Sequence, residues 1–271
     1  MGHPIFVDTH CHLDPHYFPE GAEAVLARAR AVGVAGFVVI GVGEKMQGAR
    51  DALALAERAG SSVVATAGVH PHDAAAVDDA LEAELEAIAA HARVVAVGEM
   101  GLDYHYDQSP RDVQRRVFAL QIALARRLRK PIVLHTREAA EDTLAVLESE
   151  GARDVGGVVH CFSEDRAFAT RALNLGFYLS FSGIVTFKNA KSVHDVAAWA
   201  PLDRVLLETD SPYLSPVPFR GKPCEPAYMV HTAARVASLR GIPIESLAEA
   251  TTQNAAKLFS VEPHPALESL S

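Results

Sequence analysis

Short apolar runs rich in valine, isoleucine and leucine recur eight times along this chain. They fall at residues 5–10, 36–42, 62–68, 93–99, 131–136, 156–161, 176–182 and 204–210. Runs of this kind, bounded by glycine, proline or polar residues, are typical of buried β-strands. We therefore expect eight strands.

The segments between these runs have helical periodicity and are rich in alanine, glutamate and arginine. We expect helices at residues 22–32, 45–59, 79–90, 111–129, 139–149, 165–175, 190–199 and 226–240, followed by two outer helices at 244–250 and 252–259. Successive strands are then roughly 20 to 40 residues apart, the spacing of βαβ units in a closed parallel barrel. The pattern predicts an α/β fold, a (β/α)8 TIM barrel with extra C-terminal helices.

Length and composition favour a single domain. The 271 residues are 49% hydrophobic, enough for one large core, and α/β barrels commonly reach this length as one domain. No linker, low-complexity tract or block of like charge divides the chain, so we expect one domain over residues 1–271. Pro216, Pro218, Pro223 and Pro226 instead indicate a long, stiff loop after the eighth strand.

Charge and cysteine content limit the partners and the compartment. The net charge of −9 counts against extended nucleic-acid binding, although it leaves room for a local basic groove. The three cysteines have no paired spacing, which favours a reducing compartment without disulfides. The sequence has neither a signal-peptide pattern nor an apolar run of about 18 residues, so we expect a cytoplasmic protein with no membrane contact. Nothing in it indicates an obligate protein partner.

Possible metal ligands gather at the ends of the expected strands. His10 and His12 alternate with Cys11, so on an extended strand both imidazoles point to one face. The carboxyl ends of barrel strands form the active-site face, where such side chains can converge. An unpaired buried histidine or acid would cost several kcal/mol, whereas a shared metal ion would satisfy it. The candidate ligands are His10, His12, Glu99, His135, His160 and Asp210.

Six candidates are more than one catalytic ion requires, because a catalytic zinc usually has three protein ligands and an open position. We therefore expect two divalent ions, with Glu99 as the bridge, since a carboxylate can bind two ions through its two oxygens. Mixed nitrogen and oxygen ligands suit Zn, Mn, Fe or Ni, whereas Mg prefers oxygen, so the identity stays open. The expected sets, both completed by Glu99, are His10, His12 and Asp210 for one ion, and His135 and His160 for the other.

Several motifs in chain order resemble those of the TatD family of metal-dependent hydrolases. They read DTHCHLD at 8–14, GVHPH at 68–72, VGEMGLDY at 97–104, HCFS at 160–163, LETDSPYL at 207–214 and NAAKLF at 254–259. The resemblance spans essentially the whole chain. It implies a distorted TIM barrel of the amidohydrolase type and a divalent-metal centre with the six ligands named above. It also implies deoxyribonuclease activity, including 3′-to-5′ exonuclease action on single strands in some members.

One motif departs from the family. The loop after the eighth strand resembles Arg-Gly-Lys-x-Asn-Glu-Pro, but this chain reads RGKPCEP at 220–226, so Cys224 stands in place of the asparagine.

The resemblance and the expected site together suggest a mechanism on DNA. The hypothesis is that a metal-activated water attacks a phosphodiester phosphorus, with Glu99 and Asp210 as the catalytic residues. Asp210 is either the acid/base group or a ligand only. The substrate would be DNA, single strands preferred, with RNA as a further candidate.

Other side chains on the same face are candidates for substrate contact. Arg137 and Arg220 could neutralise phosphate, or could form salt bridges with neighbouring acids. His72 could hold substrate, or with His70 form a third metal site; a rim histidine bonded to loop backbone is the alternative. Asp8 could orient a ligand imidazole or have some other partner inside the barrel.

Two competing functions stay open. The same binuclear site could polarise the carbonyl of a small amide, lactone or ester, and the net charge of −9 suits a small substrate. The third possibility is a non-catalytic, metal-containing binding protein, against which the complete set of six ligands argues.

Overall fold

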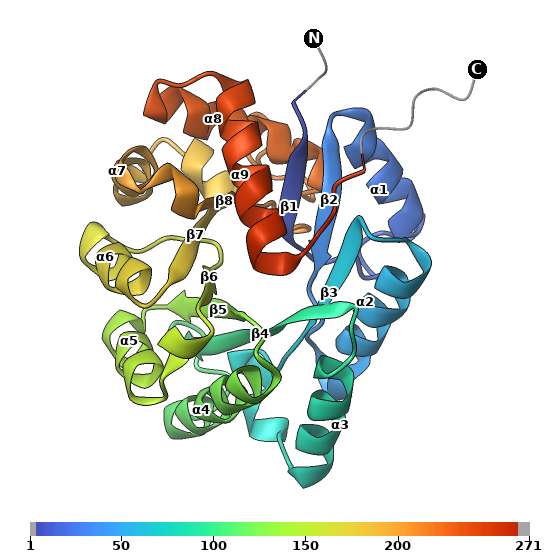
Figure 1. Ribbon diagram of the computed structural model, residues 1–271, viewed down its shortest axis with the longest axis vertical. Helices are drawn as coiled ribbons and strands as arrows, with labels where there is room; N and C mark the ends of the chain where they lie inside the picture. The colour runs from blue at the N-terminus through green and yellow to red at the C-terminus, as the bar shows by residue number, and fades with distance from the viewer. Residues whose placement is uncertain (1–3, 265–271) are drawn as a thin grey trace.

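The computed structural model describes residues 4–264. Eight parallel strands form one sheet in chain order from β1 to β8, and helices alternate with them around the outside (Figure 1). This is the expected TIM barrel. The strands are β1 (Phe6–Cys11), β2 (Val34–Val39), β3 (Val63–Ala67), β4 (Val94–Asp103), β5 (Ile132–Arg137), β6 (Gly157–Val159), β7 (Phe177–Phe181) and β8 (Val205–Leu207). The helices are α1 (Ala22–Ala31), α2 (Gln47–Arg58), α3 (Asp79–Ala89), α4 (Arg111–Leu128), α5 (Ala140–Ser149), α6 (Arg166–Asn174), α7 (Lys191–Trp199), α8 (Met229–Arg240) and α9 (Ile244–Phe259).

The seam between β1 and β8 is closed differently at its two ends. At the carboxyl ends the backbone N–H of Asp210 donates to the carbonyl of His10 at 2.9 Å, and that of His12 donates to Ser211 at 2.9 Å. At the amino ends helix α9 lies across the seam, where Thr252 Oγ1 donates to the Ile5 carbonyl at 2.8 Å (Figure 1). The barrel is therefore nearly closed, with α9 as a plug at one end.

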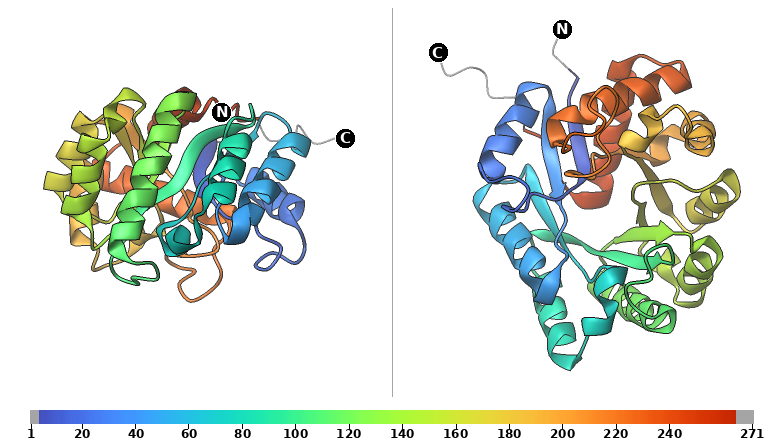
Figure 2. Two further views of the ribbon diagram at one scale, coloured as in Figure 1. Left: turned by 90° about the horizontal axis from the view of Figure 1, so that it is seen from below. Right: turned by 180° about the vertical axis from the view of Figure 1, so that it is seen from behind.

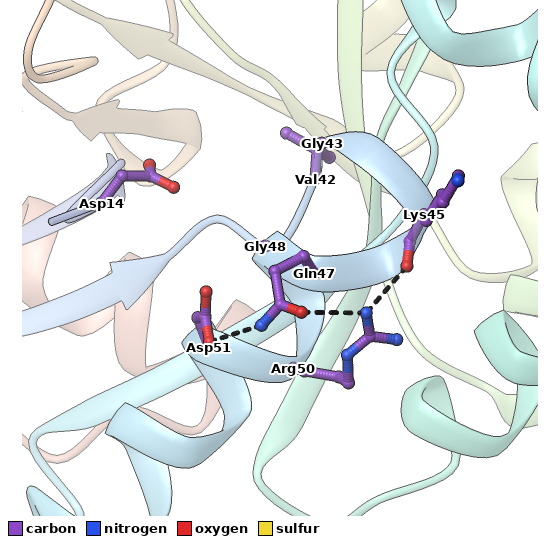
Figure 3. Close-up of a pocket in the computed structure, with 8 residues that line it drawn as sticks. All are labelled: Asp14, Val42, Gly43, Lys45, Gln47, Gly48, Arg50 and Asp51. Atoms are coloured by element: carbon purple, nitrogen blue, oxygen red, sulfur yellow. Dashed lines mark hydrogen bonds between the residues drawn. The ribbon is translucent and has the colours of Figure 1, made fainter. Parts of the chain in front are cut away.

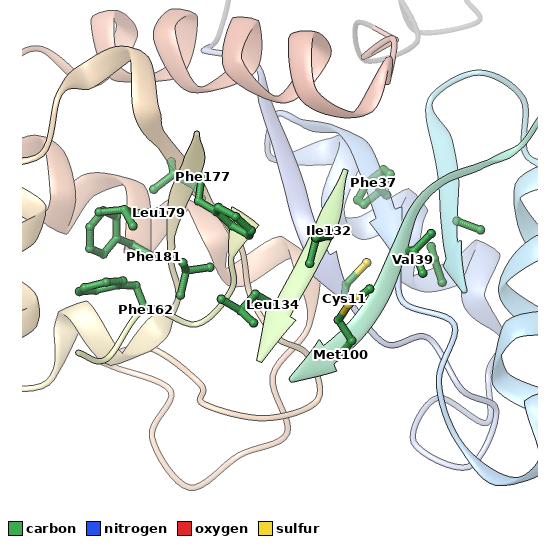
Figure 4. Close-up of a cluster of buried hydrophobic side chains, with 14 of the residues drawn as sticks. Cys11, Phe37, Val39, Met100, Ile132, Leu134, Phe162, Phe177, Leu179 and Phe181 are labelled. Atoms are coloured by element: carbon green, nitrogen blue, oxygen red, sulfur yellow. The ribbon is translucent and has the colours of Figure 1, made fainter. Parts of the chain in front are cut away.

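Both faces of the sheet are buried, which explains why the strands read as continuous apolar runs. On β7, for example, Phe177, Leu179 and Phe181 face the helices, whereas Tyr178 belongs to the cluster inside the barrel. Figure 4 shows part of the outer layer, in which side chains from several strands pack together. The inner layer is completed by Ala255 and Phe259 of α9. The interior is thus filled by side chains at the end opposite the strand carboxyl ends.

The pairing register shifts in β1 and in β4, just where the first candidate ligands lie. On β4 it shifts between Val97 and Met100, and both of these residues pack in the outer cluster. Gly98 and Glu99 therefore occupy the place of one inward residue, as in a β-bulge. Gly98 has φ +119°, a conformation that suits glycine. The shift turns the Glu99 side chain toward the barrel axis.

The structure corrects two predicted boundaries. The C-terminal tail forms one helix, α9, instead of two, because its buried side chains follow one continuous face from Leu247 to Phe259. Strand β4 continues to Asp103, beyond the predicted end at Glu99, because it pairs with β5 through Arg137. A Cβ at Gly101 would collide with the His135 backbone, so glycine allows this close approach. No helix among residues 4–264 is long and apolar enough to span a membrane.

Candidate metal centre

Glu99 lies at the centre of a buried cluster of histidines and acids at the carboxyl end of the barrel. Its Oε2 is 3.5 Å from Nε2 of His10 and 3.7 Å from Nε2 of His12. Its Oε1 is 3.2 Å from Nδ1 of His135 and 2.9 Å from Nε2 of His160. The two carboxylate oxygens therefore face two different groups of imidazoles.

Asp210 completes the group on the Oε2 side. Its Oδ1 is 3.6 Å from Nε2 of His10 and 3.7 Å from Nε2 of His12. Asp210 follows β8 and has φ +58°, and its backbone N–H is bonded to the His10 carbonyl across the seam. Closure of the barrel thus places this carboxylate opposite His10 of β1 and His12, which follows the strand.

The cluster includes one histidine beyond the six predicted ligands. His70, which follows β3, has Nε2 at 3.4 Å from Oε1 of Glu99. Its Nδ1 also accepts a hydrogen bond from the His72 backbone at 3.2 Å, so it is both a rim residue and a member of the cluster. Three groups have ligand atoms within 4.8 Å of one another: His10, His12 and Glu99; His10, His160 and Asp210; and His70, Glu99 and His135. The sequence signal for His70 was its place after a strand in the GVHPH motif.

The donor set of this cluster fits a divalent metal. Nε2 of His10, which faces Glu99 and Asp210, is buried without any hydrogen-bond partner. Leaving such atoms unpaired costs free energy, whereas a metal ion would satisfy imidazole nitrogens aimed at a common centre. The combination of imidazole and carboxylate donors suits Zn, Mn, Fe or Ni. The described cluster could therefore hold metal ions.

The pKa values of the cluster residues are shifted in different directions. Burial lowers the pKa of His12 to about 4, with His10 adding to the effect. Burial also acts to lower the pKa of His160, but the carboxylates of Glu99 and Glu208 outweigh it and raise that pKa well above the usual value. Burial raises the pKa of Asp210 well above its ordinary range. Without metal, therefore, His12 is neutral near pH 7, whereas His160 binds a proton more tightly than a free imidazole does.

Two buried acids support the cluster from behind, and the sequence reading assigned neither. Asp103 Oδ2 is 3.2 Å from Nε2 of His135 and 3.0 Å from Nε2 of His72. Glu208 Oε1 is 3.5 Å from Nδ1 of His160 and accepts a hydrogen bond from the Cys161 backbone at 2.6 Å. Carboxylates behind ligand imidazoles fix the ring orientation. Their positions inside the VGEMGLDY and LETDSPYL motifs were the only sequence signal.

Asp8 has a different partner from a ligand imidazole. Its carboxylate accepts hydrogen bonds from the Thr209 backbone at 3.0 Å and from the Thr209 hydroxyl at 2.6 Å. It also accepts from the backbone of His10 at 3.3 Å. Asp8 therefore ties β1 to the segment after β8 and stabilises the seam on which His10 and Asp210 stand.

The residues expected to contact substrate have different neighbours. His72 is held by Asp103, as described above. The guanidinium of Arg137 lies over the ring of Tyr106 at 4.8 Å, and that of Arg220 over Phe187 at 3.6 Å. Both arginines are exposed, and within residues 4–264 neither forms a salt bridge. The Cys224 side chain is fully buried, so it presents no group to a substrate.

A hollow of about 420 Å³ is lined by none of the cluster's ligands (Figure 3). It is lined by residues of the β2–α2 connection and by Asp14, which follows the His10–His12 pair. Its polar groups are largely paired: Gln47 donates to Asp51 at 2.9 Å, and Arg50 donates to Gln47 at 3.0 Å.

The loops that carry these residues share one side of the molecule. In the left view of Figure 2 the loops that follow β1, β3 and β8 project away from α9. Fold and cluster together define the class: a (β/α)8 barrel with a buried histidine and carboxylate centre, suited to metal ions, at its carboxyl end.

Comparisons with known proteins identify the family within this class. The family described as TatD related DNase matches residues 7–260. The chain is 43% identical to the uncharacterized metal-dependent hydrolase YabD of Bacillus subtilis, covering 95% of this chain and 100% of that protein. It is 45% identical to the uncharacterized metal-dependent hydrolase YcfH of Escherichia coli K12, covering 95% and 97%. The crystal structure of YjjV, a TatD homologue from E. coli K12, superposes with a TM-score of 0.86 at 33% identity, covering 95% and 98%. The chain belongs to the TatD family.

Proposed function

We propose that this protein is a divalent-metal-dependent hydrolase that cleaves phosphodiester bonds of DNA. The proposed ligands are His10, His12, Glu99, His135, His160 and Asp210, around two ions. The family described as TatD related DNase supports DNA as the substrate class, and the relatives' description as metal-dependent hydrolases supports the requirement for metal. The preferred substrate is a single strand, degraded from 3′ to 5′, and RNA is a further candidate.

The observation that carries the proposal is the position of Glu99. One of its oxygens faces His10 and His12, and the other faces His135 and His160. This arrangement suits a carboxylate shared by two ions. When bound, two ions would polarise the phosphoryl oxygens and neutralise charge on the attacking and leaving oxygens.

Asp210 is the proposed acid/base residue. Burial raises the pKa of its carboxyl well above the ordinary value, which makes the carboxylate a stronger proton acceptor. In the proposed reaction Asp210 takes a proton from the attacking water while a new P–O bond forms. It then passes the proton to the departing oxygen as the old P–O bond breaks.

Positive charge near the mouth supports an anionic substrate. Arg137 and Arg220 are exposed and lie over aromatic rings, so their guanidinium groups keep free N–H donors for phosphate. His72 is the third proposed substrate contact, positioned by Asp103. Single guanidinium contacts of this kind need no broad basic face and agree with the net charge of −9.

Cleavage of labelled DNA by reconstituted protein tests this function. Metal-stripped protein would be incubated with 5′-labelled single-stranded DNA after add-back of Mg, Mn or Zn, with Glu99→Ala as the control for contaminating nuclease. The proposal expects a stepwise ladder that needs metal and is absent for Glu99→Ala. No cleavage by protein that demonstrably holds metal would overturn it, and hydrolysis of a small ester, amide or lactone by that protein would support the alternative.

A further inference from the structure

Three exposed tyrosines lie at the mouth of the metal centre. Within residues 4–264 the exposed large hydrophobic side chains are Tyr17, Val32, Tyr106, Trp199, Tyr213 and Val217. The three tyrosines among them are 41%, 53% and 49% exposed in sequence order. They stand on the loops that follow β1, β4 and β8, at the carboxyl ends of the strands. Exposed aromatic rings are thus concentrated where substrate must enter.

Tyr213 and Tyr17 form one aromatic unit next to the β1 histidines. Their rings meet edge to face with centroids 5.9 Å apart, and their hydroxyls are hydrogen-bonded at 2.9 Å. The Tyr213 ring also meets the imidazole of His12 edge to face at 6.1 Å. The mutual hydrogen bond holds the two rings in place while about half of the Tyr213 surface stays open to solvent.

Tyr106 forms a second unit at the other end of the cluster. Its ring meets the imidazole of His72 edge to face at 5.4 Å, and the Arg137 guanidinium lies over it at 4.8 Å. His72 in turn is bonded to Asp103, which contacts His135. A chain of contacts therefore runs from Tyr213 through His12 to Glu99, and from Glu99 through His135 and Asp103 to His72 and Tyr106.

From this geometry we propose that Tyr17 with Tyr213, and Tyr106 with Arg137, are two nucleobase-stacking platforms on either side of the metal centre. This inference rests on the proposed function, because it assigns the contacts that flank the scissile phosphate. An aromatic ring stacks on any base, and a guanidinium stacked beside it can contact the adjacent phosphate. Bases must be unpaired to stack in this way, so the platforms favour single strands over duplex.

The test measures binding separately from cleavage. Fluorescence anisotropy would follow a labelled oligothymidylate, and an abasic oligomer of the same length, on metal-free wild-type protein and on the Tyr213→Leu and Tyr106→Leu variants. Wild type is expected to bind the base-containing oligomer at least about 5-fold more tightly than the abasic one. Each leucine variant is expected to lose part of that preference, because the other platform remains, and to bind the abasic oligomer as wild type does. Tyr106→Phe is expected to keep the preference.

Trp199→Leu is the matched control. Trp199 is an exposed aromatic with an arginine guanidinium over its ring, like Tyr106, but it lies on α7 in the outer ring of helices. This variant is expected to keep the wild-type preference. Equal binding of base-containing and abasic oligomers by wild type overturns both platforms. An undiminished preference in either tyrosine variant overturns the platform that this tyrosine forms.

A second substrate distinguishes failure of the platforms from failure of the proposed function. Methyl p-nitrophenyl phosphate is a phosphodiester without a nucleobase, and its hydrolysis by metal-reconstituted wild type reports the chemistry alone. Hydrolysis of this compound with no base preference in binding would overturn the platforms and leave the phosphodiesterase intact. A tyrosine-dependent base preference without hydrolysis of any phosphodiester would support the platforms and overturn the catalytic proposal.

Discussion

Glu208→Gln is predicted to weaken metal binding although Glu208 is not a proposed ligand. The carboxylate is fully buried, lies 3.5 Å from Nδ1 of His160 and accepts the Cys161 backbone N–H. Glutamine keeps the shape and one oxygen for that N–H, so the change removes mainly the negative charge behind the imidazole. That charge orients the ring and makes its other nitrogen a better donor.

The expected loss follows from the role of such supporting carboxylates. Removing one typically weakens metal affinity by about 10- to 100-fold, or about 1.4–2.7 kcal/mol. The loss depends on pH, because Glu208 also helps to raise the pKa of His160. Below that pKa, protons compete with metal for His160. Protons compete less strongly in the variant, because its His160 has a lower pKa, and this offsets part of the loss of metal affinity. The full loss of metal affinity therefore appears only above the raised pKa of His160.

Chelator-buffered Zn or Mn titrations at neutral and alkaline pH check this prediction. Exposed Glu249 on α9 gives the matched control, Glu249→Gln, which is expected to bind metal as wild type does. Wild-type affinity of folded Glu208→Gln at alkaline pH would refute the reasoning, as would a loss that is larger at neutral than at alkaline pH.

Two further predictions concern proton release and a partly buried lysine. Because metal must displace the proton that His160 holds below its raised pKa, affinity should rise with pH by about tenfold per pH unit up to that pKa. Titration calorimetry in buffers of different ionisation enthalpy should detect the released proton, and a buffer-independent enthalpy would count against it. Lys130 donates to three backbone carbonyls of the α3–β4 connection, so Lys130→Met should lower the free energy of unfolding by about 1.5–3 kcal/mol. Urea denaturation measures this, with exposed Lys191→Met as the control; equal stability of the two variants would contradict it.

The barrel could be predicted from sequence because its signal is local. The strands are largely buried on both faces and read as apolar runs, and five of the eight runs end in candidate ligands. Parallel strands bring their carboxyl ends to one face whatever the details of the helices. The prediction that His10, Glu99 and Asp210 could converge needed only this rule. In the structure, carboxylate oxygens of Glu99 and Asp210 lie 3.5 Å and 3.6 Å from Nε2 of His10.

Features that depend on contacts between distant segments could not be predicted from the sequence pattern. Alternation along β4 gives no warning of the register shift that turns Glu99 inward. The sequence left two partners open for Asp8, a ligand imidazole or another group, and only the contact between β1 and the segment after β8 identifies Thr209 as its partner. The support that Glu208 gives His160 appears only when two loops meet.

The measurement that tests the central claim most directly is the metal stoichiometry of Glu99→Gln. Glu99 faces both imidazole groups through its two oxygens, so the account predicts two ions per wild-type chain and disruption of both sites by this one change. Metal-stripped wild type and variant would be loaded with Zn or Mn at matched free metal, desalted, and assayed by inductively coupled plasma mass spectrometry. The account predicts two ions for wild type and at most one, weakly held, for Glu99→Gln. Two tightly held ions in the folded variant, or none in wild type, would contradict it.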